Sequence, residues 1–448
     1  MISSAISRWQ AVILFLFLCP LFFQLSGNVF SSAKLIYESY GSISLIPIPA
    51  ATVFCFVSIA VFLRLENSYF GMGIVFSIFV LMLLSTVISG DGQGKTELYK
   101  FVLLVQFVLP MFALIMGGLY LRPVSTYICF EAVVLYMLLL IIPAEVVSTF
   151  VQGTGYLTPY LYAFSLYQHL QYLPAIFVGL YFIAAASLYD KKRLRYLVLF
   201  LAPWVGIYIA ASLSLPAVVM AVLGSVFMTM EGCKNKEWKN AVLVVFFALT
   251  SLMLYLPMME RLAGYAADGV PKFHLKTEDI LKNSSQDKSA VDLITFAKEE
   301  GLVEGGYRKQ IAHFWIVSLQ QKFRDWAYYG AGVFESPKVF LFGHQSRPDR
   351  RLHPSASNYY LDLLYNFGAV SLLPFLYLIF ATLRKCWKAH KVKQMKPSLL
   401  MLMMVVFFFI LIDNFLHMSF RQPYSGMIIF FLWGLLLSEI SNIKGDYE

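Results

Sequence analysis

The densest group of reactive side chains lies between residues 344 and 353, directly before an apolar segment. Ten residues there contain His344, Arg347, Asp349, Arg350, Arg351 and His353. Arginine presents a planar fork of N–H donors that binds two phosphate oxygens at once. Several such forks, with histidines at a membrane surface, would suit a lipid-linked diphosphate. The alternative is a solvated rim or an anchor to lipid headgroups, as is common for basic residues near membrane ends.

The composition indicates a membrane protein. Of the 448 residues, 59% are hydrophobic and 14% are charged, whereas a soluble domain has about 25% charged residues. The net charge of +9 does not indicate nucleic-acid binding, because most Lys and Arg lie in short segments between apolar stretches. The five cysteines lie outside the polar segment 259–358 and show no zinc-binding spacing, so neither a disulfide framework nor a metal site is predicted.

Apolar stretches of roughly 20 residues, the length that crosses a bilayer, predict an all-α polytopic protein with about twelve transmembrane helices. The first stretch follows Arg8 and is interpreted as a signal anchor. Ser212, Ser214 and Pro216 predict a tight turn between the seventh and eighth spans. The candidate spans are residues 10–27, 44–64, 69–89, 100–121, 125–148, 170–189, 195–212, 214–230, 240–258, 366–384, 398–418 and 423–440.

The distribution of basic residues predicts the orientation of these spans. With a cytoplasmic N-terminus, the short inner segments hold 17 Lys and Arg and the short outer segments hold 4. Cytoplasmic loops carry the excess of positive charge, so both termini are expected in the cytoplasm of a bacterial inner membrane. The remaining 14 basic residues lie in the long segment 259–358, which is then periplasmic.

The chain is therefore divided into residues 1–258 with nine spans, the loop 259–358, and residues 359–448 with three spans. Loops of this length are usually functional or disordered. Ile311, Trp315, Leu319 and Phe323 recur every four residues, which predicts an amphipathic helix lying on the membrane or on the bundle. The run YYGAGVF at 328–334 is expected to break this helix at its two glycines.

Three stretches resemble bacterial O-antigen polymerases and O-antigen ligases. In SNYYLDLLYNFG (357–368), Asn358 and Gly368 keep the family spacing between a His-Asn pair and a glycine at the start of a helix. GYRKQIAHFW (306–315) and WAYYGAGVF (326–334) are similar to the family's Arg, aromatic and G-x-G elements. The chain departs from the family at Ser357, where the histidine is usual, and at Leu215, where a second arginine is usual.

The resemblance implies a GT-C-like, metal-independent membrane glycosyltransferase with no cofactor. Its donor would be an undecaprenyl diphosphate-linked oligosaccharide, and its partners would include the bilayer and a chain-length regulator. Arginines would neutralise the leaving diphosphate, and an imidazole would take the proton of the acceptor hydroxyl. The implied catalytic residues are His353, with His313 as the second choice. The implied diphosphate- or glycan-binding residues are Arg308, Arg347, Arg350, Arg351, His344, Asn358 and His169.

Other readings stay open at this point. A ligase would transfer the glycan to the lipid A core, and the missing arginine at Leu215 favours a polymerase. A flippase of lipid-linked oligosaccharides would also have twelve spans, although the internal repeats typical of transporters are not evident. A non-catalytic assembly factor is the third alternative. Asp362 and Asp413 are ionisable residues in apolar segments, which marks functional candidates, but an ion pair with an arginine would be a structural use.

Overall fold

A computed structural model describes a little under three fifths of the chain. The prediction of an all-α fold is confirmed for the described part, where the exception is a two-residue antiparallel pair of β1 (Ala5–Ile6) with β2 (Ile128–Cys129). The predicted spans 10–27 and 44–64, and nearly all of 240–258, lie outside the described residues. The described residues are 5–6, 70–89, 94–120, 128–151, 173–188, 191–212, 214–234, 245, 249, 253, 307–344, 356–392, 395–421 and 423–445.

Before the loop, the described part of the chain contains six long helices, and each coincides with a predicted span. All are rich in Leu, Ile, Val, Phe and Met, whose side chains suit an apolar environment. The backbone N–H and C=O groups are hydrogen-bonded within each helix. The helices are α4 (Phe70–Ser89), α5 (Gly94–Tyr120), α6 (Phe130–Val151), α7 (Leu173–Leu188), α8 (Lys192–Ser212) and α9 (Leu215–Lys234).

The predicted turn between α8 and α9 is confirmed. The Ser212 hydroxyl accepts a hydrogen bond from the Ser214 N–H at 3.3 Å, and the Ser214 hydroxyl accepts one from the Ala217 N–H at 3.4 Å. These bonds satisfy N–H groups that the start of a helix leaves unpaired. Pro216 lies in the first turn of α9, where its missing N–H costs nothing.

The predicted loop helix is present as α13 (Tyr307–Val333), followed by α14 (Pro337–Phe342). Phe323 of the predicted stripe is 60% exposed, while Asp325, Tyr329 and Val333 are buried, so the second half of α13 packs on the protein through another face, and contact of the stripe with the membrane stays a prediction. One detail of the prediction was wrong: the helix passes through Gly330 and Gly332 and ends only at Val333. Gly332 is needed there for packing, because a Cβ would overlap the Tyr365 ring.

The C-terminal part consists of α15 (Tyr359–Val392), α16 (Pro397–Phe408), the π-helical turn η2 (Phe409–Asp413), α17 (Asn414–Leu416) and α18 (Pro423–Gly445). Gly368 divides α15 into two helical parts, since its φ of 73° and ψ of 178° are not helical. A Cβ at Gly368 would overlap the Leu341 carbonyl of α14, so the glycine serves both the left-handed backbone and the close contact.

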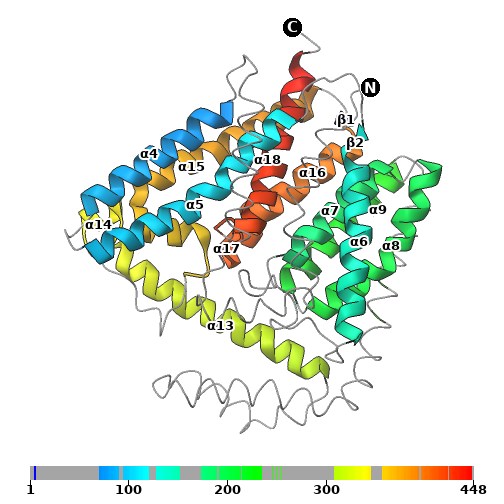
Figure 1. The fold of residues 1–448 in the computed structure, drawn as a ribbon, viewed down its shortest axis with the longest axis horizontal. Coiled ribbons are helices and arrows are strands. Elements are labelled where there is room, and N and C mark those ends of the chain that lie inside the picture. The colour runs from blue at the N-terminus through cyan, green and yellow to red at the C-terminus, as the bar shows by residue number, and fades with distance from the viewer. Residues whose placement is uncertain are drawn as a thin grey trace.

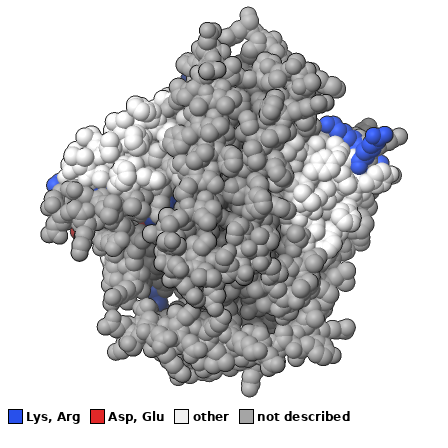
Figure 2. All heavy atoms as spheres, in the orientation of Figure 1, with Lys and Arg blue, Asp and Glu red and all other residues white. Residues whose placement is uncertain are grey.

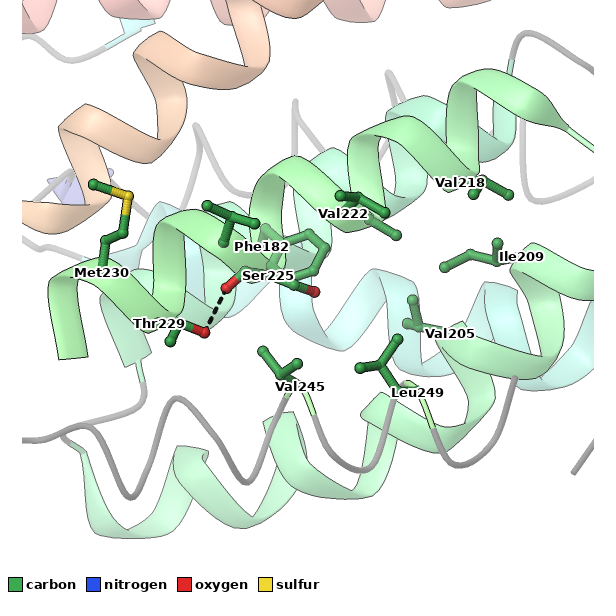
Figure 3. Close-up of a pocket in the computed structure, with 12 residues that line it drawn as sticks. Phe182, Val205, Ile209, Val218, Val222, Ser225, Thr229, Met230, Val245 and Leu249 are labelled. Atoms are coloured by element: carbon green, nitrogen blue, oxygen red, sulfur yellow. Dashed lines mark hydrogen bonds between the residues drawn. The ribbon is translucent and has the colours of Figure 1, made fainter. Parts of the chain in front are cut away.

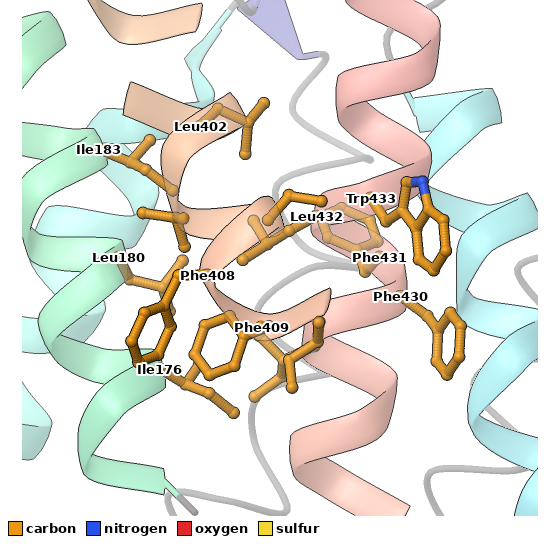
Figure 4. Close-up of a cluster of buried hydrophobic side chains, with 14 of the residues drawn as sticks. Ile176, Leu180, Ile183, Leu402, Phe408, Phe409, Phe430, Phe431, Leu432 and Trp433 are labelled. Carbon is orange, nitrogen blue, oxygen red and sulfur yellow. The ribbon is translucent and has the colours of Figure 1, made fainter. Parts of the chain in front are cut away.

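The apolar core joins the two halves of the chain. Figure 4 shows Ile176 and Leu180 of α7 against Phe408 and Phe409, with α18 on the other side. α18 also packs along α5, where a Cβ at Gly434 would overlap the Leu114 carbonyl. Small residues at such contacts let two apolar helices approach closely.

Three described helical segments are long and apolar enough to cross a membrane: Arg193–Ala210, Tyr359–Lys391 and Pro397–Leu416. Six further apolar stretches are 10–17 residues long. Figure 1 shows α13, α14 and α17 at one end of the molecule, and β1 with the C-terminal end of α18 at the other. Figure 2 shows basic side chains gathered at one edge of the described surface. Lys191, just before α8, and Arg193, in its first turn, are both exposed. The number of spans stays a prediction.

Candidate functional site

The structure describes the side chains of two of the predicted site residues, His344 and Asn358. Arg308 and His313 lie in the first two turns of α13, where the helix is described but these side chains are not. The other predicted residues lie outside the described part: Arg347, Arg350, Arg351, His353 and His169. Their roles therefore stay predictions.

His344 fastens the end of α14 to α15. Its N–H donates to the Tyr365 carbonyl at 2.7 Å, and its ring stacks on Tyr365 with 4.8 Å between centroids. Nε2 lies 3.0 Å from Glu335 Oε2, and the side chain is 14% exposed. These contacts hold α14 against α15 and already occupy one ring nitrogen.

Asn358 caps the first helical part of α15. Its side-chain oxygen accepts a hydrogen bond from the Leu361 N–H at 3.0 Å, the arrangement of an N-cap. The preceding Ser357 has a φ of 49°, a conformation that non-glycine residues seldom adopt. The Ser357 hydroxyl donates to Asp325 Oδ2 at 3.4 Å. Segment 357–368, which carries the resemblance, is thus hydrogen-bonded to the buried face of α13.

Four side chains form a buried network around Arg421, which we call the Arg421 network: Arg421, Asp362, Gln106 and Asn366. Arg421 Nη1 donates to Asp362 Oδ2 at 2.7 Å, and Nη2 donates to Gln106 Oε1 at 2.9 Å. Asn366 Nδ2 donates to Asp362 Oδ1 at 3.1 Å. The guanidinium carbon lies 5.4 Å from the Phe107 ring centroid. Both carboxylate oxygens are thus hydrogen-bonded, as a buried charge requires.

A second group, the Lys322 cluster, links α13 to the segment after α16: Lys322, His417, Asp413 and Ser419. Lys322 Nζ lies 2.7 Å from His417 Nε2. His417 Nδ1 lies 3.2 Å from Asp413 Oδ1, without a well-aligned hydrogen bond. The Ser419 hydroxyl donates to Asp413 Oδ2. The carboxylate therefore faces the imidazole, and the imidazole faces the amine.

The π-helical turn η2 positions this cluster. Asn414 Nδ2 donates to the Phe409 carbonyl at 2.8 Å, and the Tyr360 hydroxyl donates to the Ile410 carbonyl at 2.5 Å. Both acceptors are backbone carbonyls of the π-helical turn. Single π-helical turns within α-helices occur frequently at functional sites. Here the turn directs Asp413 and His417 towards α13.

Burial lowers the pKa of the Lys322 amine from 10.5 to about 8, because water no longer solvates the ammonium; the nearby Asp413 carboxylate opposes this shift. The neutral amine is therefore accessible near neutral pH. An amine in that state can accept a proton from a hydroxyl, which an ordinary lysine cannot do at that pH.

Sequence reasoning singled out Asp362 and Asp413 as ionisable residues in apolar segments, and both are buried in polar clusters. It missed Lys322, Gln106 and the pairing role of Arg421. Arg421 and Gln106 are 315 positions apart in sequence, and Lys322 and His417 are 95 apart. No local pattern connects residues so distant in the chain.

A separate apolar cavity of about 610 Å³ opens between α7, α8 and α9 (Figure 3). Phe182, Val205 and Ile209 form part of its wall, and Val222 and Val226 are more than half exposed beside it. The Thr229 hydroxyl in the wall donates to the Ser225 carbonyl at 2.8 Å. A cavity of this chemistry accepts hydrocarbon and offers little to a charged group.

Among the described residues, no group of three or more His, Cys, Asp and Glu side chains is placed to hold a metal ion. Comparison of the chain with protein-family models, curated proteins and solved structures found no match.

Proposed function

We propose that this chain is a glycosyltransferase that polymerises lipid-linked glycan repeat units at the periplasmic face of a bacterial inner membrane. The donor is an undecaprenyl diphosphate-linked oligosaccharide, and the acceptor is a hydroxyl of another repeat unit. Arg308, Arg350 and Arg351 neutralise the charge on the leaving diphosphate. The fold has twelve spans, cytoplasmic termini and the loop 259–358 outside.

The observation that carries the proposal is the position of segment 357–368, which bears the resemblance. It contacts α13 through Ser357 and Asp325, α14 through Gly368 and Leu341, and segment 409–421 through Asp362 and Arg421. The stretch that resembles the transferases therefore joins three described elements: α13, α14 and segment 409–421. Such a junction supports a site held on rigid elements.

The charge distribution supports the proposed orientation. The C-terminal turns of α15 carry Arg384, Lys388 and Lys391, and Lys396 precedes α16. In Figure 1 this end of α15 lies with the C-terminus of α18, opposite α13. An excess of basic residues marks the cytoplasmic end of a bundle.

Lipopolysaccharide from a strain that lacks this protein tests the proposal. A polymerase predicts a core that carries one repeat unit and no longer ladder. A bare core with glycan stranded on the carrier lipid would instead identify a ligase. Accumulation of lipid-linked units on the cytoplasmic face would identify a flippase.

Single substitutions locate the proposed site. Loss of one donor aimed at developing charge typically lowers a rate about 10²–10³-fold, so Arg308→Met is expected to stop elongation while translocation continues. Arg324→Met is the matched control, because Arg324 is an exposed arginine on the same helix. Labelling of a cysteine at position 350 by a membrane-impermeant reagent tests the orientation, and a cytosolic location would contradict the proposal.

A further inference from the structure

Lys322 is held in an unusual way for a buried cation. Its closest described partner is the Nε2 atom of His417, at 2.7 Å, and the carboxylate of Asp413 lies beyond the imidazole. A lysine buried for stability is expected to contact a carboxylate directly, because the desolvation of an ammonium is costly. Here an imidazole takes the place of the carboxylate, and burial lowers the pKa of the amine to about 8.

The geometry indicates which groups of the cluster donate a proton and which accept one. Asp413 faces Nδ1 and favours the tautomer that carries its proton there, so the Nε2 lone pair accepts an N–H from Lys322. A neutral lysine that donates one N–H in this way keeps its own lone pair for a hydroxyl. His417 and Asp413 are both buried, while Lys322 is half-buried, so Lys322 is the least buried residue of the cluster.

The same face of α13 offers a second polar group. Trp326 is one helical turn beyond Lys322, which places the two side chains next to each other. The indole N–H of Trp326 is buried and has no hydrogen-bond partner among the described residues. Phe323 packs edge-on against Trp326 with 5.3 Å between ring centroids and is 60% exposed. An amine, an indole donor and an exposed ring together suit a sugar, which presents hydroxyls and an apolar face.

We propose that Lys322 takes the proton of the acceptor hydroxyl, with His417 and Asp413 as positioning residues. This rests on the proposed function and replaces His353 and His313 as the proton acceptor. As the proton moves to Nζ, the acceptor oxygen forms a bond to the anomeric carbon of the donor. The bond from that carbon to the diphosphate oxygen breaks, and its electron pair leaves with the diphosphate. The ammonium then releases its proton to water.

The titratable groups around Lys322 come from three elements. His417 and Asp413 face it from segment 409–421, and Asp325 lies one turn away on α13. Tyr360 of α15 lies close to Asp413. The Asp413 carboxylate raises the pKa of the amine, so removal of its charge should lower that pKa.

Reconstituted protein with a lipid-linked repeat unit as the substrate tests the assignment. The wild-type rate, followed from about pH 6 to about pH 10, is expected to rise with a midpoint near the pKa of Lys322, about 8. Lys322→Met should lose this midpoint and transfer about 10²–10⁴-fold more slowly. Small primary amines should restore part of the rate to Lys322→Ala, and the restored rate should follow their basicity.

Asp413→Asn keeps the shape of the side chain and removes its charge. The midpoint should then move to lower pH while the folded protein remains intact by size-exclusion chromatography. Lys338→Met is the chemically matched control, since Lys338 is an exposed lysine on α14, and its profile should equal that of the wild type.

The possible failures are distinguishable. A wild-type protein that transfers no sugar overturns the proposed function, and the role of Lys322 falls with it. A wild-type protein that transfers sugar while folded Lys322→Met keeps the same midpoint overturns the Lys322 assignment alone. A midpoint that disappears in His353→Gln instead would return the role to His353.

Discussion

The Arg421 network and the Lys322 cluster lie beside adjacent residues of α15, yet they are built differently. Tyr359 packs on Phe107, the ring under Arg421, with 5.3 Å between centroids. Tyr360 bonds to η2, which leads into the Lys322 cluster. In the first group the cation contacts a carboxylate directly and both carboxylate oxygens accept hydrogen bonds. In the second group an imidazole lies between amine and carboxylate.

On the proposed function, this difference separates a structural use of charge from a chemical one. A fully hydrogen-bonded ion pair fixes α5, α15 and the segment before α18 in one arrangement, and neither partner is available to a substrate. The Lys322 amine retains a change of protonation near neutral pH. Groups with shifted pKa values gather at functional sites, although structural networks shift them too. The following variants test whether the two clusters differ in this way.

The largest effect is expected for Arg421→Met, because Asp362 would remain buried without its cation. Breaking a buried pair in this way costs about 3–5 kcal/mol, measured as the loss of unfolding free energy or of thermal midpoint in detergent. The double variant Arg421→Met/Asp362→Leu should recover most of the loss. A single variant as stable as the wild type would show that the pair does not hold the fold.

Lys322→Met, unlike Arg421→Met, should not lower the free energy of unfolding at neutral pH. Between pH about 8 and 10.5 the unfolded chain binds a proton that folded Lys322 has released, so wild-type stability should rise with pH in this window. The variant should lack this rise and should be no less stable than the wild type at neutral pH. Thermal unfolding at a series of pH values measures both. A clear loss of stability at neutral pH would class Lys322 with Arg421 as a structural cation.

Asn366→Ala should cost less than Arg421→Met, since it removes the hydrogen bonds from Asn366 Nδ2 to Asp362 Oδ1 and to the Asp362 carbonyl but leaves the ion pair. A buried acceptor that loses its donor costs about 1–3 kcal/mol. Ser371→Ala is the control, because its buried hydroxyl bonds to the Phe367 carbonyl of its own helix. Equal stabilities of the two variants would mean that Asn366 contributes little to the network.

The smallest effect is expected for Ser419→Ala, which removes the hydroxyl that donates to Asp413 Oδ2. A loss of about 0.5–1.5 kcal/mol is typical of one hydrogen bond, and Ser441→Ala near the end of α18 should cost less. Chemical denaturation in detergent compares them. A cost as large as that of Arg421→Met would make the Lys322 cluster as essential to the fold as the Arg421 network.

Most of the helical segments followed from local sequence. Nine of the predicted spans coincide with described helices or their parts, because long apolar runs have few alternatives to a helix. Ser212 and Pro216 located a turn. The resemblance placed Gly368 at the start of a helix, whereas α15 begins at Tyr359 and Gly368 interrupts it. The face that α13 turns to the protein did not follow, because Gly332 and Tyr365 fit each other only in three dimensions.

The sequence by itself determined that the chain is apolar and all-α, where its described helices lie, and that two carboxylates occur within apolar segments, where a charged group is costly. Only the tertiary structure decided what those carboxylates contact. Arg421 reaches Asp362 across 59 positions, and His417 reaches Lys322 across 95. The physical reason is that a buried charge is stabilised by whichever partner lies within a few ångströms, and helix packing, not sequence proximity, determines that partner.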